Sequence, residues 1–280
     1  MQPLYQRETI DGAELRISRR EGAPLILLVR MATGGMGLWD AVWPFLAERF
    51  TVANFDLIEA AVLDQDVPPR ARFMAMAEAT AAMATRLGHD RFHVFGWNGG
   101  CHIAQAAMAR FPDRVAGAIL LDPFFELPDM RRVWAGVDFK RALYLHPDRA
   151  LYARYFAMAG FSPGFMETNF DLVERMVENR LKTDRFIAQD VAAWERWLVA
   201  LRTNWQTEAD FAAMARVPAR IVATELDSWH AGPTPGMADA LAAHLPLASV
   251  RVVKGYGNFF FIEAPDEFAA ATGDFLPTPG

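Results

Sequence analysis

A segment with the pattern of a tight strand-to-helix turn contains the first residue that could do chemistry. It reads Gly96-Trp97-Asn98-Gly99-Gly100, which has the spacing Gly-x-Ser-x-Gly with asparagine in the serine position. This spacing is typical of a nucleophile elbow, a turn that raises one side chain above a sheet between small neighbours. An amide is a poor nucleophile because its nitrogen lone pair is delocalised. The segment therefore predicts the geometry of an acyl-transfer site without its attacking atom, and it excludes ordinary serine hydrolysis at residue 98.

The elements that would carry this elbow alternate between strands and helices. The chain begins with two strand-like segments, residues 5–10 and 14–19, that flank the hairpin turn signal Asp11-Gly12. Further strands are expected at 24–30, 51–55, 91–95, 116–121, 220–223 and 249–253, and helices at 39–50, 71–87, 99–111, 235–244 and 265–276. This alternation after an initial hairpin predicts an α/β fold, with a mostly parallel sheet wrapped by helices.

The alternation stops between residues 125 and 216, where the pattern is helical without a convincing strand. We therefore expect a core formed by residues 1–124 and 217–280, with 125–216 inserted as a helical lid over the carboxyl ends of the strands. The insertion is rich in aromatic residues: Trp134, Phe139, Tyr144, Tyr152, Tyr155, Phe156, Phe161, Phe165, Trp194, Trp197 and Trp205. Most of these must pack within the lid. A minority facing a pocket would suit an apolar or aromatic small molecule.

The composition of the chain limits the partners, cofactors and locations that we expect. The chain has 280 residues, 52% of them hydrophobic, and a net charge of -6, which argues for solubility and against a nucleic-acid partner. Its single cysteine excludes an internal disulfide and a multi-cysteine zinc site, and we expect neither a metal nor a cofactor. The apolar stretches are too short to span a bilayer, and the first residues do not resemble a signal peptide. We expect a cytoplasmic protein without a membrane partner, and a homodimer stays open.

Three further segments carry a resemblance that covers nearly the whole chain. They are "RMATGGMGLW" at 30–39, "IVATELDSW" at 221–229 and "GYGNFFFIEAPDEF" at 255–268. With the elbow, they resemble the α/β-hydrolase family, in particular the lidded branch of small esterases, C–C bond hydrolases and haloalkane dehalogenases. The resemblance implies that Asp227 is in the position of the catalytic acid. It places Asn258 where the family has its catalytic histidine, in the family's order of nucleophile, acid and histidine.

The departures from the family pattern decide the chemistry. Asn98 replaces the nucleophile and Asn258 the histidine, so the site has no imidazole to take or return a proton. We therefore do not expect hydrolysis by the family mechanism. Asn98 would either position a substrate or be a relic held by packing, and Asn258 would either hydrogen-bond Asp227 or be a relic. Asp227 would cap its turn or, in a pocket dried by the lid, serve as an acid or base itself.

Other residues could complete such a site. His230 lies three residues beyond Asp227, and Cys101 lies on the first turn of the helix after the elbow, where the helix dipole lowers a thiol's pKa. Both are weighed as substitutes for the missing pair, although a turn histidine and a small buried cysteine are the simpler interpretations. The remaining candidates would bind the substrate or an oxyanion, mostly through backbone N–H groups: Arg30, Met31, Ala32, Trp97 and Gly99. Arg30 could also contribute the positive charge of its side chain.

Three functions stay open on the sequence alone. The first is a non-hydrolytic enzyme, of the lyase, isomerase or cyclase type, that polarises an apolar carbonyl compound with Asn98, Asn258, Asp227 and an oxyanion hole. The second is a catalytically inactive pseudo-hydrolase that binds a ligand or a partner. The third is a hydrolase with a rearranged mechanism that uses His230 or Cys101. The retained elbow glycines, Asp227 and apolar lid favour a working pocket.

Overall fold

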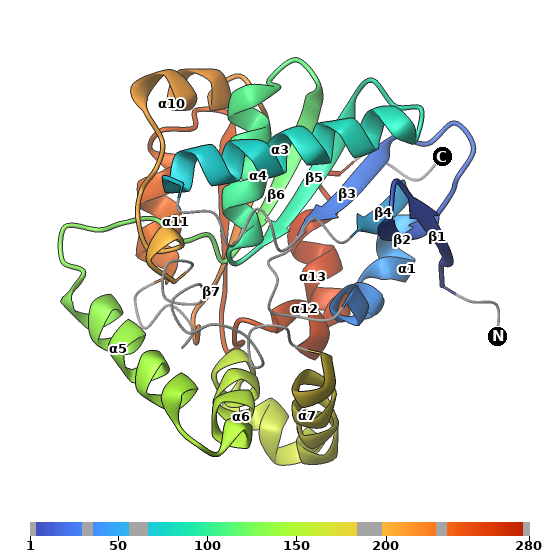
Figure 1. The fold of residues 1–280 in the computed structure, drawn as a ribbon. Helices are drawn as coiled ribbons and strands as arrows, with labels where there is room; N and C mark the ends of the chain where they lie inside the picture. The colour runs from blue at the N-terminus through green and yellow to red at the C-terminus, as the bar shows by residue number, and fades with distance from the viewer. Residues whose placement is uncertain (1–3, 30–35, 56–66, 184–197, 228–233, 277–280) are drawn as a thin grey trace.

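The computed structural model describes residues 4–29, 36–55, 67–183, 198–227 and 234–276, and these form one eight-stranded sheet with helices around it (Figure 1). The strand order is β1-β2-β4-β3-β5-β6-β7-β8. The strands are β1 Gln6–Ile10, β2 Ala13–Ser18, β3 Leu25–Val29, β4 Thr51–Phe55, β5 Phe92–Trp97, β6 Val115–Leu121, β7 Ala219–Thr224 and β8 Ala248–Val253. Only the β1–β2 and β2–β4 pairs are antiparallel. The predicted mostly parallel α/β sheet is confirmed.

The initial hairpin forms where the sequence predicted it. Asp11 and Gly12 have φ angles of 49° and 83°, so both adopt the left-handed conformation that a two-residue hairpin turn requires. Ile10 pairs directly with Ala13 across the turn. Strands β3 and β4, by contrast, are buried at every position, as expected for central strands covered on both faces.

The helices also follow the predicted order. They are η1 Met36–Ala41, α1 Trp43–Ala47, α3 Pro69–Arg86, α4 Gly100–Arg110, α5 Arg131–Leu145, α6 Arg149–Gly160, α7 Pro163–Thr183, α10 Glu208–Met214, α11 Thr234–Ala242, α12 Phe260–Glu263 and α13 Pro265–Thr272. The single helix predicted at 39–50 is instead a 3-10 turn followed by a short α-helix. Pro44 explains the break, because it lacks the N–H that a continuous helix would use and starts a new helix in its first turn.

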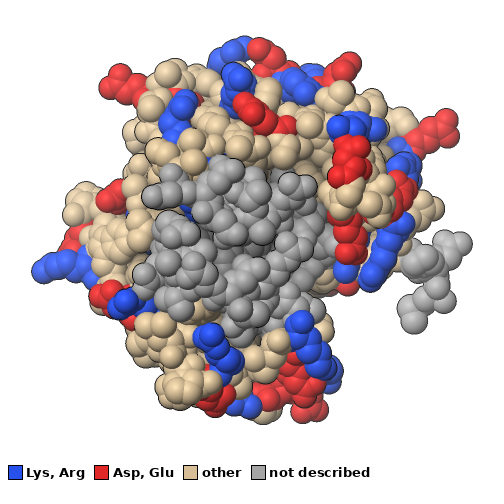
Figure 2. All heavy atoms as spheres, viewed as in Figure 1, with Lys and Arg blue, Asp and Glu red and all other residues tan. Residues whose placement is uncertain are grey.

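Helices from different parts of the chain cover the sheet. Helices α3 and α4 pack together in front of the central strands in Figure 1, and α11 packs on β7 and β8. On α13, Phe268 stacks on Phe95 of β5 with ring centroids 5.3 Å apart. In the described part of the chain, no helix is both long and apolar enough to cross a membrane. On the face seen in Figure 2, charged side chains of both signs are intermixed around the rim.

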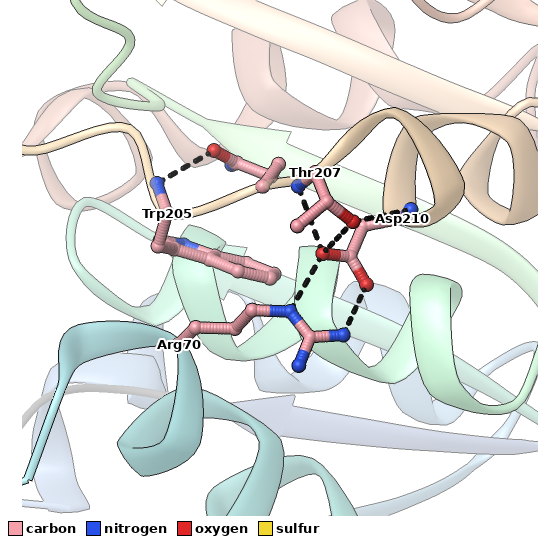
Figure 3. A network of polar contacts seen from close by, with 5 residues as sticks. Arg70, Trp205, Thr207 and Asp210 are labelled. Carbon is pink, nitrogen blue, oxygen red and sulfur yellow. Dashed lines mark hydrogen bonds and ion pairs between the residues drawn. The ribbon is translucent and has the colours of Figure 1, made fainter.

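Helices α5, α6 and α7 lie between β6 and β7 in the sequence and are grouped together below the sheet in Figure 1. The described residues between those two strands include no strand, in agreement with the helical pattern. The last helix of this region, α10, packs instead on α4, and Asp210 in it accepts two hydrogen bonds from Arg70 of α3 (Figure 3). The proposed lid boundaries stay a prediction, and α10 at their end is attached to the core.

Candidate active site

The turn between β5 and α4 has the geometry of an elbow. Asn98 has a φ of 51°, a left-handed conformation that asparagine tolerates better than most residues, and its N–H donates to the Leu121 carbonyl at 2.8 Å. A Cβ atom on Gly96 would lie only 2.6 Å from the Gly100 carbonyl oxygen. Gly96 is therefore required by the close approach of the two backbone segments, and the side chain at 98 is held at the carboxyl end of the sheet.

The Asn98 side chain folds back onto the elbow. Its Oδ1 accepts a hydrogen bond from the Gly99 N–H at 2.7 Å, and its Nδ2 approaches Oδ1 of Asn258 at 3.5 Å, the outer limit of a hydrogen bond. The Gly99 N–H is the donor that the sequence assigned to an oxyanion hole. In the structure this donor is directed at the protein's own amide oxygen, which any substrate oxygen would have to displace.

Asn258 joins the elbow to a carboxyl group that the sequence analysis missed. Its Nδ2 donates to Oδ2 of Asp122 at 3.1 Å, and its main-chain oxygen accepts from the indole N–H of Trp97 at 3.0 Å. Asn258 is fully buried. The expected partner, Asp227, is not the residue that its amide contacts. Of the two roles left open for Asn258, a hydrogen bond to Asp227 or a relic, neither includes the hydrogen bond that its amide makes with the aspartate following β6.

Asp122 directly follows β6 and is completely buried with a φ of 48°. Its carboxyl group also accepts from the N–H and the hydroxyl of Thr224, at 2.7 and 2.9 Å. Burial, reinforced by the charge of Asp227, raises the pKa of Asp122 well above its usual range, against the lowering effect of the hydrogen bonds from Thr224 and Asn258. The sequence contained a signal for this residue, namely an aspartate at the end of a buried strand neighbouring the elbow strand.

Asp227 belongs to a second group of side chains. It follows the turn after β7, is buried, and accepts a hydrogen bond from the Thr234 hydroxyl at 3.0 Å. Its charge acts on Lys140, Arg202 and Tyr155 as well as on the carboxyl group after β6. Sequence reasoning did not find Lys140 or Arg202, because a single lysine or arginine in a helical segment is normally a surface residue.

The Cys101 alternative is not supported by the geometry. The thiol is fully buried and donates to the carbonyl oxygens of Gly96 and Leu121, at 3.2 and 3.3 Å, within the helix–sheet interface. Burial and the negative charge of Asp122 raise the pKa of Cys101 well above its usual range, so the helix dipole does not yield a reactive thiolate. The interpretation as a small core residue fits this environment.

Two histidines in core elements, His102 and His93, make the contacts of structural residues. The Nδ1 atom of His102 accepts from the indole N–H of Trp205 at 3.0 Å, so Nε2 carries the proton and donates to the Leu201 carbonyl at 3.1 Å. His93 packs against Phe50, and burial lowers its pKa to about 4. Neither imidazole replaces the one missing at position 258.

Four predicted site residues lie outside the described residues: Arg30, Met31, Ala32 and His230. The second oxyanion donor and the His230 alternative therefore stay predictions. Among the described residues, no group of histidine, cysteine, aspartate and glutamate side chains has the arrangement of a metal site.

The loop that carries Asn258 is tied to the inserted helices. The N–H of Phe259 donates to the Gly160 carbonyl at 2.7 Å, and a Cβ atom on Gly160 would lie 2.2 Å from the Phe259 ring. Glu263 accepts from the N–H of Gly257 at 3.1 Å and from the N–H of Ser162 at 2.9 Å. The junction between α6 and α7 thus fixes the loop from both ends.

The fold and the elbow together define a protein of the α/β-hydrolase type. The chain matches the model of the alpha/beta hydrolase family over residues 26–271, and it belongs to this family. A curated relative, fluoroacetate dehalogenase from Burkholderia sp, is 28% identical over 124 residues, which span 42% of this chain and 41% of that protein.

Solved structures agree with this assignment at the level of the fold. The α/β-hydrolase enzyme MGS-M2 from a Medee basin deep-sea metagenome library has a TM-score of 0.74 and 16% identity over 98% of both chains. The enol-lactonase from Burkholderia xenovorans LB400 has a TM-score of 0.71 and 17% identity, covering 96% of this chain and 99% of that one. A thermophilic esterase from Thermogutta terrifontis has a TM-score of 0.70 and 18% identity, covering 96% and 97%. At these identities the likeness describes the fold alone.

Proposed function

We propose that this protein is a non-hydrolytic enzyme of the lyase, isomerase or cyclase type, which binds an apolar carbonyl compound at the elbow. The observation that carries the proposal is the hydrogen-bonded chain from Asp122 through Asn258 and Asn98 to the Gly99 N–H. Two of its members are amides, which neither attack a carbonyl carbon nor take up or release a proton at neutral pH. The chain therefore supports positioning and polarisation of a substrate, and it opposes an acyl-enzyme mechanism.

The donors needed for polarisation are available at the elbow. Turning the Asn98 side chain away breaks its long contact with Asn258 and the 2.7 Å hydrogen bond from the Gly99 N–H, and a substrate oxygen would replace Oδ1 as the acceptor of that N–H. That rotation frees the Gly99 N–H and presents Nδ2 on the same side. A carbonyl or enolate oxygen that accepts from both groups would be stabilised as negative charge develops on it.

A ligand-binding protein without turnover is the second candidate. The observation that favours it is the hydrogen bond from the Gly99 N–H to Asn98 Oδ1. An oxyanion donor that is already hydrogen-bonded within the protein stabilises the negative charge of a transition state less. A rearranged hydrolase has no support from Cys101.

The test begins with native mass spectrometry of the freshly purified chain to identify a retained small molecule, followed by incubation of that compound with ligand-free protein. A product isomeric with the substrate, or fragments without added water, supports the proposal. Asn98→Ala is expected to lower the turnover by about 10²- to 10³-fold, the usual cost of one oxyanion donor.

Two controls separate the alternatives. 4-Nitrophenyl acetate should not be hydrolysed, and a fluorophosphonate should not label the chain. Tight binding of the retained compound without conversion would favour the binding protein. Fragments containing the elements of water would overturn the proposal in favour of a hydrolase.

A further inference from the structure

The hydrogen-bonded chain beneath the elbow begins and ends in a backbone N–H, which can only donate. At one end the Thr224 N–H donates to Oδ1 of Asp122 at 2.7 Å. At the other end the Gly99 N–H donates to Oδ1 of Asn98 at 2.7 Å. Each amide between these ends accepts through its oxygen and donates through its nitrogen, so such a chain closes only if one member accepts on both sides. The carboxyl group of Asp122 is that member.

Asp122 thereby determines which way the Asn258 amide faces. Its Oδ2 accepts from Asn258 Nδ2 at 3.1 Å, which leaves the amide oxygen of Asn258 facing Asn98 as an acceptor. A proton on Asp122 leaves this direction unchanged, because its O–H can donate to the Thr224 hydroxyl 2.9 Å away while the same oxygen still accepts from the amide. Asp122, Thr224 and Asn258 are fully buried, so bulk water does not compete for these bonds.

The contact between the two amides is the weakest link. Asn98 Nδ2 lies 3.5 Å from Asn258 Oδ1, whereas the hydrogen bonds from Gly99 and to Asp122 on either side measure 2.7 and 3.1 Å. With the Asn258 oxygen facing it, the Asn98 nitrogen has an acceptor while the Asn98 oxygen holds the Gly99 N–H. With Asn258 reversed, two amide nitrogens would face each other. This mismatch would favour a turn of the Asn98 side chain away from the elbow.

We propose that Asp122 is a positioning residue that keeps the elbow closed in the ligand-free protein. By holding the Asn258 oxygen towards Asn98, it stabilises the orientation in which the Asn98 oxygen occupies the Gly99 N–H. A substrate oxygen then reaches this donor only by displacing the amide oxygen. This role rests on the proposed function for its meaning, because the Gly99 N–H is a donor that the proposed reaction needs, but it can be tested without a substrate.

Hydrogen exchange of the Gly99 N–H in the ligand-free full chain measures whether the elbow is closed. Asn98-Gly99 is the only Asn-Gly pair in the sequence, so labelling with ¹³C-carbonyl asparagine and ¹⁵N-glycine isolates this amide in a carbonyl–amide correlation spectrum. In Asp122→Asn the new side-chain oxygen must accept from the Thr224 N–H, so its nitrogen faces Asn258 and reverses that amide. Exchange at Gly99 is expected to accelerate about two- to tenfold relative to the other glycine amides, the factor for one hydrogen bond.

Two controls isolate the direction of the amides from general destabilisation. Combining Asp122→Asn with Asn258→Asp moves the double acceptor to position 258, where it accepts from both neighbouring amides, so exchange at Gly99 should return to the wild-type rate. Asp210→Asn is the matched control, because Asp210 also accepts from the N–H and the hydroxyl of a threonine but belongs to α10. It should leave exchange at Gly99 unchanged, and Asn98→Ala gives the rate of an open elbow.

If Asp122→Asn does not fold, two variants of Asn258 decide the outcome. Asn258→Ala removes the oxygen that faces Asn98 and should accelerate exchange at Gly99, whereas Asn258→Asp keeps an acceptor there and should not. An Asp122→Asn variant in which Gly99 changes no more than the other glycine amides, or a double variant that exchanges as fast as the single one, overturns the positioning role. Selective acceleration without turnover of any retained compound would keep this role and refute the enzyme, and turnover without selective acceleration would do the reverse.

Discussion

Replacing Asp122 tests the hydrogen-bond chain beneath the elbow. Its carboxyl group accepts from the Thr224 N–H at 2.7 Å, the Thr224 hydroxyl at 2.9 Å and the Asn258 amide at 3.1 Å. In Asp122→Ala the hydroxyl can turn elsewhere, but the other two buried donors lose their acceptor, at about 1 to 3 kcal/mol each. Alanine at a φ of 48° costs about 1 kcal/mol more. We expect the free energy of unfolding at pH 5 to fall by about 3 to 7 kcal/mol.

Asp122→Asn separates the loss of hydrogen bonds from the loss of the ionisable group. The asparagine oxygen can still accept from the Thr224 N–H, and its amide can donate to the Thr224 hydroxyl. Only the contact with Asn258 brings two donors together, and rotation of the Asn258 amide moves this mismatch to its long 3.5 Å contact with Asn98. Asparagine also tolerates the left-handed backbone. We expect this variant to lose only about 1 to 2 kcal/mol at pH 5.

The raised pKa of Asp122 determines how the stability of the wild type changes with pH. Because the pKa of Asp122 is raised in the folded protein, the native state holds a proton that the unfolded chain releases above about pH 4. Between that value and the folded pKa, the contribution of Asp122 to stability falls as the pH rises, by at most about 1.4 kcal/mol per pH unit. Asp122→Asn has no such titrating group, so its free energy of unfolding should rise relative to that of the wild type as the pH increases.

Urea unfolding followed by tryptophan fluorescence at pH 5, 6, 7 and 8 measures these differences. At pH 5 the wild type should have the larger free energy of unfolding; this difference from Asp122→Asn should shrink as the pH rises and then change sign. A gap that stays constant over this range would refute the raised pKa. An Asp122→Ala variant as stable as Asp122→Asn would refute the hydrogen-bond assignment.

Three further predictions concern residues that support the elbow and the core around it. Gly96→Ala should destabilise the fold by about 1 to 3 kcal/mol in urea unfolding, because its Cβ meets backbone, whereas Gly164→Ala, with open space around it, should not. Arg70→Met should lower the free energy of unfolding by about 1 kcal/mol at pH 7, because Arg70, together with the Thr207 hydrogen bonds, lowers the pKa of Asp210 to about 2 and the half-exposed guanidinium is screened by solvent. Thermal unfolding should show this loss disappearing as the pH falls from about 4 towards 2. Cys101 should react with Ellman's reagent only in denaturant; rapid labelling of the native chain would contradict its burial.

The sequence predicted the fold well because its signals are local. Asp11-Gly12 specified the hairpin, and the buried strand segments fixed the sheet. The predicted helix at 39–50 was the main departure, where Pro44 divides the segment. In the same way, Gly96 and Asn98 predicted the elbow, since the turn depends only on adjacent residues.

The partners within the site were less predictable. Asn258 bonds Asp122, 136 positions away, and two aspartates end neighbouring strands, so pattern alone could not choose between Asp122 and Asp227. The buried pair Lys140 and Arg202 depends on how the inserted helices dock, which no local spacing encodes.

The contact between Gly160 and Phe259 has a consequence for protein engineering. Here a Cβ atom at position 160 would enter the Phe259 ring, and the Gly257 N–H shares the Glu263 carboxylate with Ser162. A chimera that received the inserted helices of a relative without a glycine at 160 would displace residue 258 as well. The position of residue 258 therefore depends on the residue at position 160, and a graft of the helices must transfer the 255–263 loop with them.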